Sequence, residues 1–398
     1  MPTESTFLLA GLLFLAAALG YFFARFGDDE EDDVFLPSSR LNADYIKGLN
    51  YLLNEQPDQA LEVFMRMVEV DDETLETHFA LGSLFRRRGE VDRAIRVHQN
   101  LIARPDLSSM HRENALVALA EDYLSAGLFD RAETLFKELS GSAEFRSKAL
   151  EKLVRIYEVT HDWKPAIEAC TELEKLSPAR ETSSRIAHYY CELAEEALQE
   201  RDFASASDCL QHAAKARKST LRASLLMAVV AQESGDHAQA IELFREVMEQ
   251  QPHLIGEVVP RLAASCRATN NDELLTEMLN DARDRGADAS RAIALAAIYN
   301  RRIDNPVALQ CLQDYVLADR VLAKLIPADQ LQSGDPAARK LALEQIREGL
   351  AQMFSPAHRY RCRECGYHTS QLAWQCPSCR TWESVAPSAH LGLAALAV

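Results

Sequence analysis

The sequence predicts an all-α chain, and three observations support this prediction. Turn residues are scarce, with 15 Gly and 14 Pro among 398 residues, where the two make up about 12% of average proteins. Hydrophobic residues reach 47% but aromatic residues only 7%, so the apolar content is mostly Ala and Leu, which favour helices. A pattern of small and large apolar residues recurs about every 34 positions. We therefore predict a superhelix of repeated helical pairs, with an N-terminal transmembrane helix and a small C-terminal metal-binding ribbon.

The first predicted element is a single-pass membrane anchor in residues 1–27. Residues 7–24 carry no charge, and residues 7–26 suffice for a helix that crosses the hydrocarbon core of about 30 Å. A cleaved signal peptide would need a basic start and small residues at its end, whereas this run ends in bulky aromatic residues. The first basic residues, Arg25, Arg40 and Lys47, all follow the run. The positive-inside rule therefore places the body of the chain in the cytoplasm.

A linker of residues 28–40 follows the anchor. Its residues 28–33 are six consecutive acids, which repel one another and anionic headgroups, so we expect an extended spacer. A docking site for a basic partner is the alternative interpretation. The repeated body is predicted to begin at Leu41.

The body, residues 41–355, consists of about nine copies of one unit. Gly48 and Ala60 of the first copy recur as Gly82 and Ala94 in the second. Later copies centre on Ala132, Ala166, Ala206, Ala240, Leu274, Ala308 and Ala342. Small residues twelve positions apart allow the two helices of a pair to approach closely. The pattern resembles the tetratricopeptide repeat, whose stacked pairs form a superhelix with a concave groove.

One possible metal site inside the body is interpreted as packing. His188 and Cys191, and likewise Cys209 and His212, are spaced to share a helical face and could form a Cys₂His₂ site. Ala-rich helices, however, often contain single cysteines as small apolar residues. We expect these four side chains to pack without a metal.

The ribbon, residues 356–384, carries the predicted metal site, and residues 385–398 are assigned to a tail. Its ligands are predicted to be Cys362, Cys365, Cys376 and Cys379, two Cys-x-x-Cys knuckles whose thiolates can surround one ion. Zinc is favoured as the cofactor, and iron fits the same ligands. The other five cysteines are scattered, which indicates a reducing compartment rather than a disulfide framework. Gly366 follows the first knuckle, but Arg380 holds the equivalent place in the second, so either Arg380 has an unusual backbone angle or this turn differs.

The charge distribution bears on the partners. The chain has 43 basic and 60 acidic residues, a net charge of −17, which repels phosphate backbones, so no nucleic acid partner is expected. Residues 358–382 of the ribbon are basic, with Arg359, Arg361, Arg363 and Arg380 against Glu364 alone. We therefore expect the ribbon to dock on the acidic helices of its own chain or on a protein partner.

These features together resemble the lipopolysaccharide assembly protein B family of Gram-negative inner membranes. The resemblance is most specific in GSLFRRRGEVDRAIRVHQNL (residues 82–101) and in RYRCRECGY…WQCPSCRTW (residues 359–382). It implies an adaptor on the cytoplasmic side of the inner membrane, which regulates lipopolysaccharide synthesis by presenting the LpxC deacetylase to the FtsH protease. It also implies that the four ribbon cysteines bind the metal.

The residues by themselves favour a protein-binding scaffold that is not an enzyme. No phosphate-binding loop, dinucleotide glycine pattern, zinc-protease motif or Ser/His/Asp arrangement is recognisable. The alternatives are a rubredoxin-like electron carrier attached to a scaffold, and a general envelope-assembly scaffold, even a periplasmic one. Whether the chain forms a homo-oligomer is left open.

Overall fold

A computed structural model describes residues 46–388, except for 49, 52–53, 55, 67–71, 179, 217–220, 301–304, 319–321, 326–334 and 354–358. The predicted anchor, the acidic linker and the last ten residues of the predicted tail lie outside this part. Among the described helices, none is both long and apolar enough to cross a membrane. The chain divides into two compact units, residues 1–139 and 140–398.

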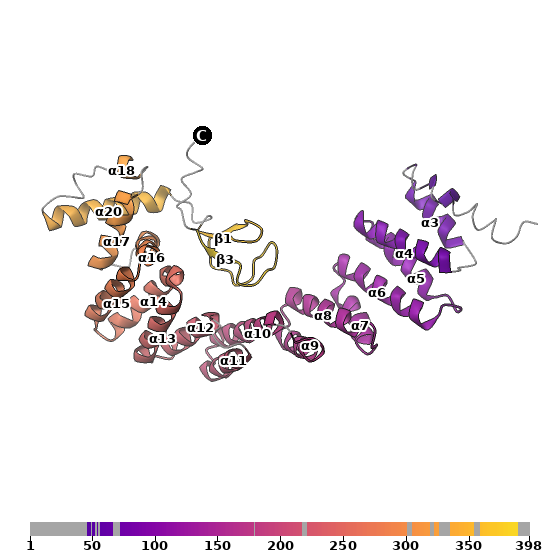
Figure 1. Ribbon diagram of the computed structural model, residues 1–398, viewed down its shortest axis with the longest axis horizontal. Helices are drawn as coiled ribbons and strands as arrows, with labels where there is room; N and C mark the ends of the chain where they lie inside the picture. Colours follow the sequence, from indigo (N-terminus) through magenta and orange to yellow (C-terminus); the bar gives the residue numbers. More distant parts are fainter. Residues whose placement is uncertain are drawn as a thin grey trace, which may run out of the picture. The chain divides into compact units, whose positions relative to one another are not determined.

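The first unit contains successive helices of the repeats. They are α3 (Pro57–Arg66), α4 (Asp72–Arg87), α5 (Val91–Ile102), α6 (Ser109–Ser125) and α7 (Phe129–Leu139). Consecutive helices from α4 to α7 pack against each other (Figure 1). The predicted close-contact residues Ala60, Ala94 and Ala132 are fully buried. A Cβ atom built on Gly82 would lie 2.4 Å from the His98 ring, so a small residue is required where α4 crosses α5.

The second unit continues the helical pairs. Its helices are α8 (Arg146–Thr160), α9 (Trp163–Leu176), α10 (Arg180–Gln199), α11 (Phe203–Ala216), α12 (Leu221–Glu233), α13 (His237–Gln250), η1 (Pro252–Leu254), α14 (Ile255–Ala268), α15 (Asp272–Asp284), α16 (Ala287–Tyr299), α17 (Pro306–Ala318), α18 (Leu322–Leu325) and α20 (Pro336–Met353). Pairing of adjacent helices is confirmed for α8 with α9, α10 with α11, α12 with α13, and α16 with α17. The fold class predicted for the body is therefore confirmed.

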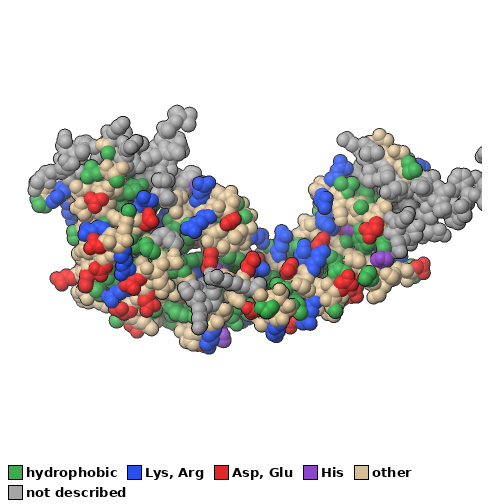
Figure 2. All heavy atoms as spheres, viewed as in Figure 1, with side chains coloured by type: hydrophobic (Ala, Val, Ile, Leu, Met, Phe, Trp, Pro, Cys, Tyr) green, Lys and Arg blue, Asp and Glu red, His purple; other side chains and the backbone are tan. Residues whose placement is uncertain are grey.

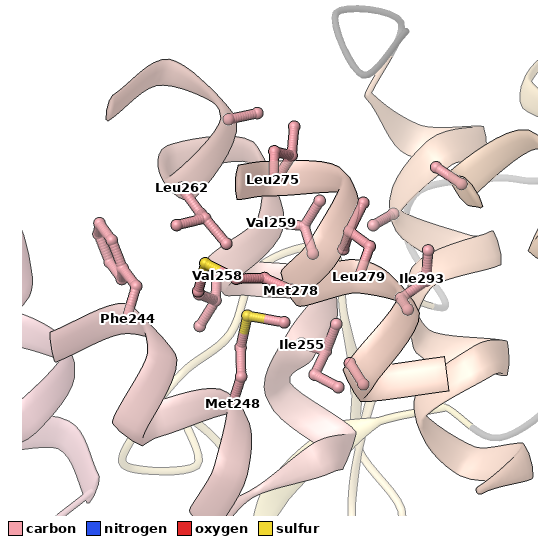
Figure 3. Close-up of a cluster of buried hydrophobic side chains, with 14 of the residues drawn as sticks. Phe244, Met248, Ile255, Val258, Val259, Leu262, Leu275, Met278, Leu279 and Ile293 are labelled. Atoms are coloured by element: carbon pink, nitrogen blue, oxygen red, sulfur yellow. The ribbon is translucent and has the colours of Figure 1, made fainter. Parts of the chain in front are cut away.

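Apolar side chains from neighbouring pairs interlock to form the core of this unit. One cluster combines Phe244 and Met248 of α13 with Val258 of α14, Met278 of α15 and Ile293 of α16 (Figure 3). Each side chain in the cluster is nearly or fully buried. No pair can bury this surface alone, so each pair is stabilised mainly by its neighbours.

A small antiparallel sheet forms the ribbon. Its strands are β1 (Tyr360–Cys362), β2 (His368–Thr369) and β3 (Val385–Pro387), in the order β2-β1-β3. The sequence placed β3 in the tail, but Cys362 pairs with Val385 and Tyr360 with Pro387. The ribbon thus extends past residue 384. A three-residue strand is too short to show the alternation that predicts a strand, and its proline is tolerated because β3 is an edge strand.

Candidate metal centre and ribbon interface

The four ribbon cysteines converge on one point. Their Sγ atoms all lie within 4.8 Å of one another. The sulfur of Cys362 is 3.7 Å from that of Cys379, and the sulfur of Cys365 is 3.7 Å from that of Cys376. A tetrahedron with metal–sulfur bonds of about 2.3 Å has edges of about 3.8 Å. The spacing therefore fits one metal ion held by four thiolates.

The protein already favours the thiolate form at two of these positions. Hydrogen bonding to the backbone N–H of Cys365 and with the Ser384 side chain lowers the pKa of Cys362 to about 6. Hydrogen bonding with the side chain and backbone of Thr381 lowers the pKa of Cys379. Burial instead raises the pKa of Cys376 to about 11. Because only thiolates bind the metal, Cys376 depends most on a nearby cation for its charged form.

Both knuckles turn through a left-handed residue. Gly366 has φ of 77°, and Arg380 has φ of 59°. The N–H of Gly366 donates to the Cys362 carbonyl at 3.1 Å, and that of Arg380 donates to the Cys376 carbonyl at 2.8 Å. Of the two outcomes expected for Arg380, the unusual backbone angle is confirmed. A residue with a Cβ in this conformation costs about 1–2 kcal/mol.

The ribbon docks on helices of its own chain, and its first contact is made by the strand β1. Arg359, next to this strand, donates to the Glu257 carboxylate of α14 at 2.6 Å. The Tyr360 hydroxyl donates to the same carboxylate. The Arg359 guanidinium also lies 5.0 Å from the ring centre of Tyr299 on α16. One acidic side chain thus holds both a charged and a neutral donor of the ribbon.

Trp382 makes the second contact. Its indole stacks on the His188 ring, with ring centres 4.6 Å apart and an angle of 13°. It also meets the Tyr189 ring edge-on at 5.9 Å, and its N–H donates to the Glu158 carboxylate of α8 at 3.1 Å. Next to it, the Glu383 carboxylate lies 3.3 Å from the His188 Nε2. The residues after the second knuckle therefore lie directly on α8 and α10.

A third contact joins the ribbon to α12. The Arg222 guanidinium lies 5.8 Å from the Trp374 ring centre, and its side chain is only 2% exposed. It also pairs with Glu192 at 2.8 Å and Glu195 at 2.9 Å. In total the ribbon contacts α8, α10, α12, α14 and α16, the first helices of five successive pairs (Figure 1).

One ion pair of the predicted kind joins the ribbon to the helices, between Arg359 and Glu257 of α14. Acidic and basic side chains are mixed over the visible face of this unit (Figure 2), so this contact depends on a single pair of residues. The expectation that the ribbon docks on helices of its own chain is thus met. The residues that receive it, such as Glu158 and Glu257, were not singled out in the sequence because isolated glutamates in a helix give no signal of a long-range partner.

The alternative Cys₂His₂ site does not assemble. Within the described part of the chain, the four ribbon cysteines form the one group suited to a metal ion. His188 stacks on Trp382, while His212 stacks on Tyr190 with ring centres 5.2 Å apart. Cys191 is fully buried, and burial raises its thiol pKa to about 12. The packing interpretation therefore fits these four residues, with His188 acting as a platform for the ribbon.

The fold and the four-sulfur site define a tetratricopeptide-repeat protein with a rubredoxin-like metal ribbon. Models of the tetratricopeptide repeat match residues 77–109 and 191–254, and a model of the rubredoxin metal binding domain matches residues 360–387. Lipopolysaccharide assembly protein B from Escherichia coli (strain K12) is 34% identical over 389 residues, 96% of this chain and 97% of that protein. The protein of the same name from Haemophilus influenzae is 32% identical over 96% of this chain and 98% of its own length. The chain belongs to the lipopolysaccharide assembly protein B family.

Proposed function

We propose that this chain is a membrane-anchored adaptor on the cytoplasmic side of the inner membrane, which presents the LpxC deacetylase to the FtsH protease and thereby limits lipopolysaccharide synthesis. The observation that carries this proposal is that the metal ribbon and the repeat helices pack together in one compact unit, residues 140–398. The ribbon is held by charged and aromatic contacts across the first helices of five pairs. A scaffold that orients one protein toward another needs such a fixed relation between its binding surfaces. The family's name supports a role in lipopolysaccharide assembly.

Within this proposal, Cys362, Cys365, Cys376 and Cys379 hold one structural zinc ion. Four protein sulfurs complete a tetrahedral site, which leaves no position for a reactive water. A segment as short as this ribbon cannot bury enough apolar surface to fold alone. When bound, the metal supplies folding free energy, and the residues around it keep Trp374 and Trp382 placed against the helices.

A second candidate function, electron transfer, follows from the exposure of two sulfurs. Cys365 and Cys379 are exposed, whereas Cys362 and Cys376 are buried. If the ion is iron, exposed ligands would bring it within reach of a redox partner. Elemental analysis and the visible spectrum of the purified chain decide between the two functions: the adaptor proposal predicts stoichiometric, colourless zinc, and a coloured iron site would favour electron transfer.

The anchor is central to the proposed mechanism. Confining adaptor, protease and client to one membrane surface raises their effective concentration, which can strengthen a modest affinity by about 10²–10⁴ without new contacts. Deleting residues 1–26 should leave LpxC binding in solution intact but prevent LpxC degradation in cells, so LpxC levels rise. The measurement is LpxC half-life at matched adaptor expression, in a strain that lacks its own family member. Normal turnover with the anchorless chain would refute the mechanism.

A further inference from the structure

A cleft of about 520 Å³ lies where the second knuckle of the ribbon meets the repeat helices. The helix side is lined by Glu181, Ser184 and Arg185 of α10, and the ribbon side by Arg380, Trp382 and Glu383. Binding sites for small ligands typically measure about 300–1,000 Å³. The cleft is therefore large enough to hold several atoms of a ligand, and it exists only when the ribbon is docked.

Part of the lining is already satisfied by internal contacts. The Glu158 carboxylate, whose side chain is 9% exposed, accepts from Arg185 at 3.2 Å, from Tyr189 at 2.5 Å and from Trp382 at 3.1 Å. Glu383 pairs with His188. These contacts fix one wall of the cleft without a ligand, so the site is built before anything binds.

Two other charged side chains that line the cleft have no such internal ion pair or hydrogen bond among the described residues. Arg380 on the ribbon and Glu181 on α10 both line the cleft and are exposed. Within the described residues, neither forms an ion pair or a side-chain hydrogen bond. The cleft thus presents one cation and one anion from opposite walls, with the Trp382 ring between the ribbon and the helices.

The backbone at Arg380 is a separate observation that points to the same place. Arg380 and Glu383 are the two non-glycine residues with positive φ in the described ribbon, at 59° and 54°, and both line the cleft. Gly366 makes the equivalent turn of the first knuckle without a Cβ. A glycine at position 380 would adopt this backbone conformation without strain, so the turn itself does not explain why an arginine stands there. Strained residues often mark binding sites.

We propose that this cleft binds an extended peptide segment of a partner protein, which presents an acidic side chain to Arg380 and a neighbouring basic side chain to Glu181. Phosphate ligands are disfavoured because three carboxylates line the cleft against two guanidinium groups. A peptide can place one acidic side chain against Arg380 and one basic side chain against Glu181. The aliphatic parts of these peptide side chains can then pack on the Trp382 ring. The proposal uses only the protein-binding part of the proposed function and does not depend on LpxC or FtsH.

The test is peptide selection on the purified, metal-loaded full chain in detergent micelles. The probe is a phage-displayed library of random 12-residue peptides, counter-selected on the Arg380→Glu variant. We expect enriched peptides with an acidic and a basic residue within about five positions. In fluorescence anisotropy, labelled copies of these peptides should lose at least tenfold in affinity with Arg380→Glu and with Glu181→Lys. The matched control is Arg363→Glu, the same charge change on an exposed arginine of the first knuckle, which should bind normally.

Two further variants separate recognition from folding. Arg380→Gly removes the side chain and the backbone strain together, so the ribbon should keep its metal and its docking while peptide binding falls at least tenfold. The double variant Glu181→Lys with Arg380→Glu should prefer peptides in which the two charges are exchanged. Enrichment of the same peptides on Arg380→Glu, binders without paired charges, no enrichment, or full binding by Arg380→Gly would each overturn the proposal. If peptides bind as expected while LpxC turnover does not need the chain, this inference stands and the proposed function fails.

Discussion

Replacing Trp382 by alanine tests how strongly docking supports the metal site. The change removes the stack on His188 and the edge contact with Tyr189, each worth about 0.5–1.5 kcal/mol. It also removes the hydrogen bond to the Glu158 carboxylate, and bonds to charged groups contribute about 1.5–3 kcal/mol. These contributions are not additive, and we take about 3 kcal/mol as the loss. This corresponds to about a 100-fold change in the docking equilibrium.

Metal affinity is the sensitive measurement because docking and metal binding are linked. If the metal-free ribbon is unfolded and cannot dock, docking stabilises only the metal-bound form and adds to its affinity. We therefore expect Trp382→Ala to bind zinc up to about 100-fold more weakly in competition with a chromogenic chelator. The four cysteines are unchanged, so saturating zinc should still give one ion per chain.

The matched control for this experiment is Trp374→Ala. Trp374 contributes a cation–π contact with Arg222, which is worth about 0.5–2 kcal/mol, so the loss in zinc affinity should be smaller. If Trp382→Ala keeps its zinc affinity within about twofold, either the metal-free ribbon stays docked or the contacts contribute nothing, and the reasoning is refuted.

Four further changes test other parts of the molecule. Cys376→Ser should abolish stoichiometric metal and unfold the ribbon while circular dichroism still shows helical repeats; a variant that retains one metal per chain contradicts the site. Ala94→Leu should overpack α4 against α5 and cost about 1–3 kcal/mol, with hydrogen-exchange protection lost mainly in neighbouring pairs; uniform loss along the chain would argue against an array. Lowering the pH should release zinc, because protons compete with the metal for the thiolates. The pKa of Cys362 is lowered to about 6 in the folded ribbon even without metal, so its stabilising thiolate is lost only as the pH falls through 6, and bound zinc should protect it to lower pH still. Zinc release that is already complete above pH 6, followed with the same chelator, would contradict that assignment. Replacing residues 7–24 by an unrelated transmembrane helix should fail to restore LpxC turnover if the segment packs against another membrane helix; full rescue would show that it is only a tether.

The ribbon shows which structural features can be predicted from local sequence and which cannot. The two Cys-x-x-Cys knuckles predicted the convergence of four sulfurs because each knuckle fixes two ligands within one turn, and one metal ion can join the two turns. The predicted boundary at residue 384 was too early because β3 is defined by its pairing with β1. Pairing is a long-range property, so three residues without alternation could not reveal it.

A second example is the crossing between α4 and α5. The repeat alignment placed His98 at a position that is Phe64 and Phe136 in the neighbouring copies, which suggests apolar packing. In the structure, the Nδ1 of fully buried His98 lies 2.5 Å from the carboxylate of buried Asp122. Arg86 also pairs with Asp122 at 2.7 Å. The alignment found the position but not the buried polar network.

By itself, the sequence determined the helical pairs, the places where their backbones approach, and the four cysteines of the candidate metal site. These features depend on spacings within about one repeat, where helix geometry and turn chemistry leave few alternatives. Only the tertiary structure decided where the ribbon lies, that Trp382 stacks on His188, and that Arg380 and Glu181 line one cleft. The physical reason is distance along the chain. The contacts of Trp382 with α8 and α10 join residues that lie about 200 positions apart, and their partners are ordinary helical residues until the stack of repeats brings their faces together.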